Sequence, residues 1–154
     1  MKDQLYNDST RSMIATIALG LRVDRAVSTH LAATTPYFTV SGGPILLTGL
    51  LGTVVVASGA NLSSWAATPT TGAATSLSGD LDIDPAVAGG HLTITGVGNA
   101  AMTYNASATG LAMMATAVIV PIGTLDFIAA AADGSTVWSM WYKPLAVGAT
   151  VVVA

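Results

Sequence analysis

The chain has 154 residues and a net charge of −3, with 52% hydrophobic and only 8% charged residues. One domain of this length can bury a substantial core, but ordinary soluble domains carry roughly a quarter charged residues. The five Lys and Arg residues are too few to form an electrostatic footprint on nucleic acid. The absence of cysteine excludes disulfides and thiolate metal sites. So little charge predicts surfaces that are buried against other chains.

Apolar residues near the N-terminus recur at the spacing of one helix face. The residues of this stripe are Met13, Ile14, Ile17, Ala18 and Leu21. Two interpretations stay open: a helix packed on its own domain, or an arm laid on a neighbouring chain. Residues 22–36 mix charges with small residues and end in Thr-Thr-Pro, which favours extended backbone. We therefore expect an N-terminal helix or extended arm over residues 1–36.

Two apolar segments, residues 13–21 and 45–57, raise the question of membrane insertion. The first lacks a small-residue cleavage site and is followed by Arg22, Asp24 and Arg25, which is atypical of a signal peptide. The second is shorter than the ~20 residues that a spanning helix requires. We expect no membrane association.

Residues 37–57 predict two strands around a tight turn. Residues 37–40 form the first strand, and the Ser-Gly-Gly sequence at 41–43 forms the turn. Residues 45–57 are rich in Leu, Val and Thr, which favours a long buried strand. Gly49 and Gly52 within this strand indicate bulges or a close approach of another backbone.

The middle of the chain predicts irregular structure followed by short strands. Residues 58–79 are rich in Ser, Thr, Ala and Gly, which is typical of a loop or irregular edge, with Trp65 as a single side chain covering the core. The short strands expected after this segment are residues 81–83, 91–97, 102–104 and 116–120.

The C-terminal part predicts a β-hairpin followed by a short closing strand. Two apolar-rich runs, residues 124–130 and 136–143, flank an Asp-Gly dipeptide, which tolerates the positive φ of a tight turn. Alternation in the second run places Trp138, Met140 and Tyr142 on one face and Trp141 on the other. Because each face carries a Trp, we expect both faces of this strand to be covered.

The expected fold is an all-β, antiparallel β-sandwich or barrel over residues 37–154, preceded by the N-terminal helix or extended arm. Roughly seven to nine short strands occur at intervals near the ~8–12 residues typical of a sandwich or barrel. The spacing of a βαβ unit is missing, so a parallel sheet is not expected.

Asp80, Asp82 and Asp84 alternate with two apolar residues. Carboxylates are ligands that Ca²⁺ accepts, so the three acids are a weak calcium candidate. The EF-hand pattern fails, because the turn glycine and the bidentate glutamate are both missing. The favoured interpretation is an edge strand whose Asp side chains face water and prevent unwanted pairing.

No motif predicts catalysis or a cofactor. His30 and His91 are isolated and form no zinc-binding pair at i, i+4. Composition alone leaves a Ser–His–Asp triad open, but no nucleophile elbow supports one. Aromatic side chains could form a sugar-stacking face, yet strand-spaced aromatics are more typical of a core or a subunit interface. We expect a protein that is not an enzyme.

Two parts of the chain carry a resemblance to a known family. Residues 36–43 read Pro-Tyr-Phe-Thr-Val-Ser-Gly-Gly, and Gly-Thr-Leu-Asp at 123–126 precedes the Trp-containing segment 134–154. With an extended head and a middle rich in Ser, Thr and Ala, this pattern resembles small virion structural proteins of tailed bacteriophages, of the capsid cement or decoration type. The resemblance covers about half of the chain and leaves out residues 58–110.

The resemblance implies a non-enzymatic β-sandwich that forms homo-oligomers, commonly trimers. Such proteins bind the major capsid protein or other virion proteins across subunit joints on the outer surface of the phage head, and the N-terminal arm would serve as a clasp. Residues 26–79 and 85–124 contain no charged side chain, which suits surfaces buried against partners. The candidate interface residues are Met13, Ile17, Leu21, Tyr37, Phe38, Trp138, Trp141 and Tyr142.

Two other functions stay open. One is a neck, tail or fibre-base component of the virion. The other is a carbohydrate-binding β-sandwich module that uses Trp65, Trp138 or Trp141, although these rings lie among apolar residues rather than beside polar partners. Of Trp138 and Trp141, we expect one to stabilise the domain and the other to support assembly, and the sequence does not distinguish them.

Overall fold

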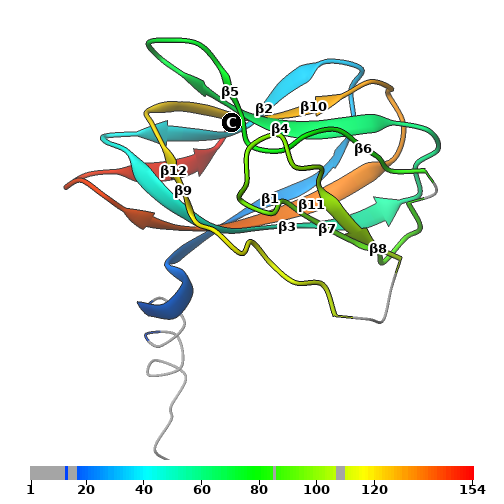
Figure 1. Cartoon of the computed structure of the whole chain (residues 1–154), viewed down its shortest axis with the longest axis horizontal. Coiled ribbons are helices and arrows are strands. Elements are labelled where there is room, and N and C mark those ends of the chain that lie inside the picture. Colours follow the sequence, from blue (N-terminus) through cyan, green and yellow to red (C-terminus); the bar gives the residue numbers. More distant parts are fainter. Residues whose placement is uncertain (1–12, 14–16, 85, 107–109) are drawn as a thin grey trace, which may run out of the picture.

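The computed structural model describes residues 13, 17–84, 86–106 and 110–154, and these form two antiparallel sheets packed as a sandwich (Figure 1). Sheet A has the strand order β1-β11-β3-β7-β8, with β9 also paired to β3. Sheet B has the order β12-β2-β10-β4-β5, with β6 also paired to β4. The predicted all-β, antiparallel sandwich is confirmed.

The strands of each sheet come from distant parts of the chain. Sheet A contains β1 (Leu21–Thr29), β3 (Ile45–Val56), β7 (His91–Thr93), β8 (Thr103–Asn105), β9 (Val118–Val120) and β11 (Ser135–Pro144). Sheet B contains β2 (Thr34–Ser41), β4 (Leu62–Pro69), β5 (Thr75–Ser76), β6 (Leu81–Asp82), β10 (Gly123–Ala129) and β12 (Thr150–Val153).

The core lies between the sheets and is centred on aromatic side chains from both. Trp65 of β4 and Trp138 of β11 meet edge to face with ring centroids 4.8 Å apart, an arrangement that suits the ring quadrupoles. Phe127 of β10 lies 5.4 Å from Trp65 and 5.6 Å from Trp138. All three are buried, so the expectation that Trp65 covers the core is confirmed.

A β-bulge in β2 places two consecutive aromatic side chains in this core. The register with β10 shifts between Leu125, which lies opposite Phe38, and Asp126, which lies opposite Pro36. Neighbouring residues of a regular strand point to opposite faces, but a bulge lets both point the same way. Tyr37 and Phe38 are accordingly both buried.

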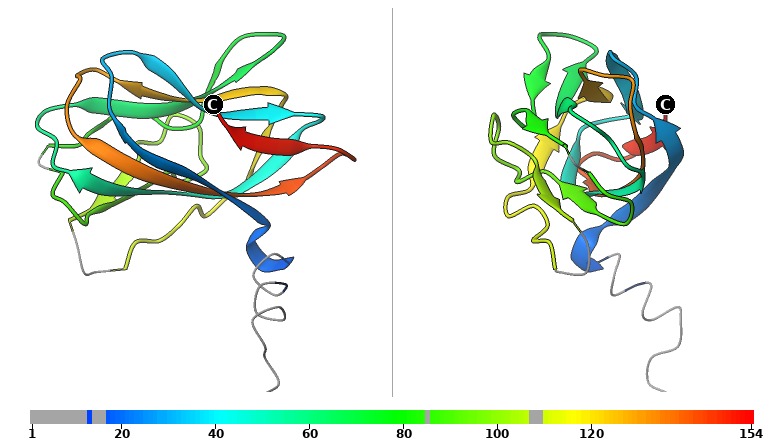
Figure 2. Two further views of the ribbon diagram at one scale, coloured as in Figure 1. Left: turned by 180° about the vertical axis from the view of Figure 1, so that it is seen from behind. Right: turned by 90° about the vertical axis from the view of Figure 1, so that its right-hand side faces the viewer.

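The predicted C-terminal hairpin is wrong. β10 pairs with β2 and β4 in sheet B, whereas β11 pairs with β1 and β3 in sheet A. Residues 130–134 therefore cross from one sheet to the other (Figure 2). Gly134 has the positive φ, 75°, expected of a hairpin turn. The same backbone conformation also occurs in a loop that crosses between sheets, so it does not by itself indicate a hairpin. Because the two strands lie in opposite sheets, the rings of Phe127 and Trp138 meet across the core at a tilt of 49°.

Two segments that were expected to be irregular or extended form strands. Residues 58–79 include β4, an inner strand of sheet B whose small Ser63, Ser64 and Ala67 are buried. Strand preference reflects how well a side chain fits a half-buried surface. The small residues of β4 lie opposite larger residues of β10, with Ala67 opposite Leu125 and Ser64 opposite Ile128. Residues 22–36 include most of β1, which pairs with β11, so the expected arm boundary at residue 36 falls inside β2.

The remaining predicted elements are present. Residues 45–57 correspond to β3, and the short strands at 81–83, 91–97, 102–104 and 116–120 correspond to β6, β7, β8 and β9 with shorter or shifted bounds. Met13 and residues 17–19 are helical, and Ile14 of the predicted stripe lies outside the described residues. Within the described ranges, no helix has the length and hydropathy needed to span a membrane.

Candidate interaction surface

Four loops meet at one end of the sandwich, and none of them contains a charged residue. They are residues 42–44, 70–74, 121–122 and 145–149. Backbone hydrogen bonds join them in pairs, from Leu145 N to Pro44 O at 3.1 Å and from Thr70 N to Ile122 O at 2.9 Å. We call this surface the uncharged end; it lies on the left in Figure 1.

Apolar side chains project into solvent at the uncharged end. Val147, at the tip of the β11–β12 loop, is fully exposed, and Leu145 and Ile122 are also exposed. Ile119 on the adjacent β9 is 66% exposed. Gly148 has a φ of 84°, so the chain turns sharply after Val147 before β12 begins. Apolar groups that gather without charge typically mark an interaction site.

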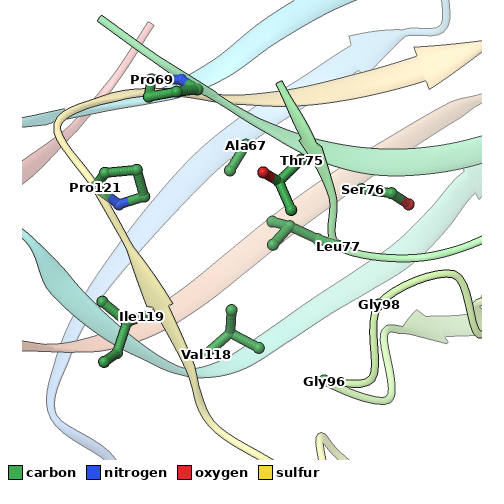
Figure 3. Close-up of a pocket in the computed structure, with 10 residues that line it drawn as sticks. All are labelled: Ala67, Pro69, Thr75, Ser76, Leu77, Gly96, Gly98, Val118, Ile119 and Pro121. Atoms are coloured by element: carbon green, nitrogen blue, oxygen red, sulfur yellow. The ribbon is translucent and has the colours of Figure 1, made fainter. Parts of the chain in front are cut away.

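A pocket of about 230 Å³ lies beside the uncharged end, between β5 and β9 (Figure 3). Its apolar lining includes Ala67, Pro69, Leu77, Val118, Ile119 and Pro121. Pockets for drug-sized ligands measure roughly 300–1,000 Å³. This pocket is smaller, so its size suits one apolar side chain or a small apolar molecule.

The opposite end of the sandwich is acidic. Asp84 and Asp133 lie in its loops, and Asp80 and Asp82 lie at β6. The predicted alternation is confirmed, because the side chains of Asp80, Asp82 and Asp84 are exposed while Ile83 is buried. Over the described part of the chain, no group of three His, Cys, Asp or Glu side chains could hold a metal ion. The calcium candidate is therefore not assembled as a site.

A hydrogen-bond network at the acidic end fixes the crossing loop. The Asn61 amide donates to Ala131 O at 3.0 Å and accepts from Ala131 N at 3.0 Å. Asp133 Oδ2 accepts from Gly59 N at 2.6 Å, and Asp82 Oδ1 accepts from Asn61 N at 3.1 Å. Two of the four acidic side chains thus have structural partners in the fold.

Four predicted interface residues lie instead in the core of their own domain. They are Tyr37, Phe38, Trp138 and Tyr142, all buried. A partner could reach them only if the sandwich opened. The prediction misplaced these residues because large aromatic side chains stabilise cores and interfaces by the same burial.

Three predicted interface residues are available to a partner. Met13 is 58% exposed and Ile17 is 69% exposed, and Leu21 at the start of β1 is also exposed. The helical residues 17–19 lie below sheet A (Figure 1), and Leu19 O at their end accepts a hydrogen bond from Thr48 Oγ1 of β3. Of the two interpretations of this segment, exposure of its apolar side chains favours the arm.

Trp141 lies on the outer face of sheet A and is half-buried. The Arg22 guanidinium of β1 lies 5.3 Å from its ring centroid. Arg22 Nε also contacts Asp24 Oδ1 at 2.8 Å, and Ser139 Oγ donates to the same oxygen at 2.6 Å. The Ser139 hydrogen bond, helped by Arg22, lowers the pKa of Asp24. The prediction that both faces of β11 are covered therefore holds only in part, because the outer face that carries Trp141 is half-exposed.

His30 is a core residue. Its Nε2 lies 3.1 Å from Thr136 Oγ1, its ring lies 5.0 Å from Phe127, and its Nδ1 is buried without a hydrogen-bond partner. Burial lowers the pKa of this imidazole. A catalytic triad places a carboxylate on the second ring nitrogen, and His30 does not have that arrangement.

Residue-by-residue reading of the sequence missed the uncharged end. The available signal was the loop at residues 144–149, which reads Pro-Leu-Ala-Val-Gly-Ala and contains no polar side chain between two strands. No family model, curated protein or solved structure matches the chain. A function therefore has to be inferred from the residues and their arrangement.

Proposed function

We propose that the chain is a non-enzymatic virion structural protein of the capsid-decoration type. It binds the major capsid protein, or other virion proteins, through the uncharged end and the apolar N-terminal segment. The observation that carries this proposal is the uncharged end, where four loops without charge meet and two of them present Val147, Leu145 and Ile122 to solvent.

The proposed mechanism is burial of apolar surface across joints between capsid subunits. Removing apolar area from water contributes about 25 cal/mol per Å². A modest contact repeated over a shell therefore adds resistance to outward pressure from packed nucleic acid. The acidic end would then face solvent, where its Asp side chains stay hydrated.

A neck, tail or fibre-base role would use the same apolar contacts, and it differs only in location. The carbohydrate-binding alternative has less support. A sugar platform requires exposed rings, whereas Trp65 and Trp138 are buried and Trp141 is half-covered beside Arg22.

Electron cryo-microscopy of virions from the source of the sequence tests the location. We expect density for the sandwich on the outer head surface, with the uncharged end toward the shell. Density in the neck or tail would replace the decoration role with the alternative, and absence from every virion component would overturn the proposal.

Binding to purified heads that lack this protein tests the contact. The Ile122→Asp substitution places a charge on the uncharged end and should weaken co-sedimentation with heads at least tenfold. Val56→Asp is the matched control, because Val56 is similarly exposed but lies at the acidic end of β3. Equal loss of binding in both variants would contradict docking through the uncharged end.

A further inference from the structure

The outer face of sheet A carries a half-buried aromatic ring between a cation and a methionine. The Arg22 guanidinium of β1 lies 5.3 Å from the ring centroid of Trp141. On the β3 side, a Cβ added to Gly49 would collide with Met113 Cε and would lie 3.2 Å from Trp141 Cε3. The methionine and the ring therefore meet above this glycine. Trp, Arg and Met are residue types that are enriched at protein interfaces.

The available positive charge of the described residues gathers beside this ring. Lys143 lies two residues after Trp141 on the same face of β11, and it has no ion pair among the described residues. Arg25, the third basic residue of the described ranges, is committed elsewhere. Its guanidinium lies 4.2 Å from the Tyr37 ring centroid and donates to Ala154 O at 2.9 Å. The exposed acids gather instead at the acidic end.

Asp24 is the one acidic residue in the described strands of sheet A, and its carboxylate is already bound. Its Oδ1 accepts hydrogen bonds from Ser139 Oγ at 2.6 Å and from Arg22 Nε at 2.8 Å. Arg22 Nη2 donates to Ser139 Oγ at 3.2 Å, so Nη1 has no hydrogen bond within the described ranges, on a side chain that is 56% exposed. Two cations and one bound carboxylate leave a positive balance on this face. We call this surface the basic patch; it consists of Arg22, Met113, Trp141 and Lys143.

We propose that the basic patch binds a partner segment that carries carboxylate side chains beside apolar ones. A carboxylate accepts a hydrogen bond from Arg22 Nη1 and is attracted by Lys143. An apolar neighbour in the same segment covers the exposed part of the Trp141 ring, where a buried aromatic contact contributes most to affinity. Only the identity of the partner rests on the proposed function.

The charge and position of the patch favour a protein segment over a phosphate polymer. Affinity for nucleic acid comes from many phosphate contacts, and two cations supply few of them. Apolar side chains beside the cations match the mixed chemistry of a protein interface instead. The patch also adjoins the uncharged end, because Lys143 leads through Pro144 into the loop at residues 145–149. One partner can therefore cover both surfaces.

Fluorescence anisotropy with two short labelled peptides tests the charge preference. One peptide contains Leu and Glu, and the other contains Leu and Lys. Because the chain carries a net charge of −3, non-specific attraction favours the basic peptide, and only a local positive patch favours the acidic one. We expect the acidic peptide to bind at least tenfold more tightly at low salt and to lose this advantage as salt screens the charges. Tighter binding of the basic peptide, or of a single-stranded oligonucleotide, would overturn the proposal.

Two substitutions that each lower the net charge by one locate the binding. Lys143→Gln removes a cation from the basic patch and should weaken binding of the acidic peptide about fivefold or more. Val55→Glu is the matched control, because Val55 is 45% exposed on β3 near the acidic end. It should change the affinity less than twofold. Equal effects of the two substitutions would show that net charge, rather than the patch, controls binding, and would overturn the proposal.

Sedimentation separates this inference from a contact between copies and from the proposed function. We expect Lys143→Gln to weaken co-sedimentation with heads and to leave sedimentation of the purified chain unchanged. An oligomer that both Lys143→Gln and Asp82→Asn dissociate would assign the patch to the acidic end of a second copy and overturn the proposal. A chain that binds the acidic peptide but not heads would overturn the proposed function alone. Binding to heads that neither salt nor Lys143→Gln weakens would overturn the role of the basic patch alone.

Discussion

Gly52 of β3 lies directly opposite Trp138 of β11, and the indole fills the space that a side chain at residue 52 would need. A Cβ added to Gly52 would lie 2.8 Å from the ring atom Cη2, closer than carbon atoms pack in proteins. The glycine is therefore required for Trp138 to reach Trp65 across the core.

Gly52→Ala should lower the free energy of unfolding by about 1–3 kcal/mol, the usual cost of adding a methyl group to a filled core. Urea unfolding followed by tryptophan fluorescence measures this change. Gly110→Ala is the matched control, because no atom lies within 4 Å of an added Cβ there. If the urea midpoint of Gly52→Ala equalled that of the control, the Trp138 ring would be able to move away from an added methyl group without loss of stability.

Trp138→Ala and Trp141→Ala should separate domain stability from surface contacts. Trp138 is buried, so its loss should cost about 3–5 kcal/mol of unfolding free energy. Trp141 is half-buried on the outer face, so its loss should cost less than half of that amount. Urea titration of both variants checks the order, and a larger loss for Trp141→Ala would contradict the assignment of Trp138 to the core.

Stability should fall as the pH decreases below 6.5, because of His30. Burial holds the folded-state pKa of His30 below the ordinary value of 6.5, although the nearby Asp133 partly opposes this shift. Below pH 6.5 the unfolded chain therefore binds more protons than the folded chain, and the free energy of unfolding decreases toward the folded-state pKa. Above pH 6.5 this contribution is constant.

Urea midpoints above and below pH 6.5 measure the effect. The His30→Gln variant retains a polar group near Thr136 but cannot titrate in this range, so its midpoint should change less with pH than that of the unsubstituted protein. Parallel pH profiles for the two proteins would assign the acid sensitivity to another group.

Asn61→Ala should loosen the crossing between β10 and β11. The substitution removes both partners of the Ala131 backbone groups, and an unsatisfied backbone group costs about 1–3 kcal/mol when water cannot replace the bond. Amide hydrogen exchange should accelerate at residues 130–134 more than in β3. Leu62→Ala, at an exposed neighbouring residue, is the control and should leave exchange in the loop unchanged.

Local patterns in the sequence predicted which side chains share one face of a strand. In β11, alternation assigned Trp138, Met140 and Tyr142 to one face, and all three are buried. This succeeds because successive side chains of a strand point to opposite faces, whatever the strand pairs with. It fails at the β2 bulge, where Tyr37 and Phe38 both face the core because the register with β10 shifts.

Strand pairing could not be predicted in the same way. The Asp-Gly sequence at 133–134 satisfies a turn with positive φ, yet the chain continues into the opposite sheet. The choice depends on contacts between distant residues, such as Asn61 with Ala131 and Gly52 with Trp138. The small residues of β4 show no alternation of apolar and polar side chains that would predict a strand. Their strand conformation depends on pairing with β10, which lies far away in the chain.

The sequence by itself determined the all-β class, the grouping of side chains on the two faces of the long strands and the scarcity of charge, since alternation and composition are local properties. Only the tertiary structure decided which face of β11 is inward, and with it which of Trp138 and Trp141 joins the core, and which loops meet. Loop positions follow from strand pairing, and pairing joins segments far apart in the chain. For that reason, the uncharged end and its exposed Val147 became visible only in the folded chain.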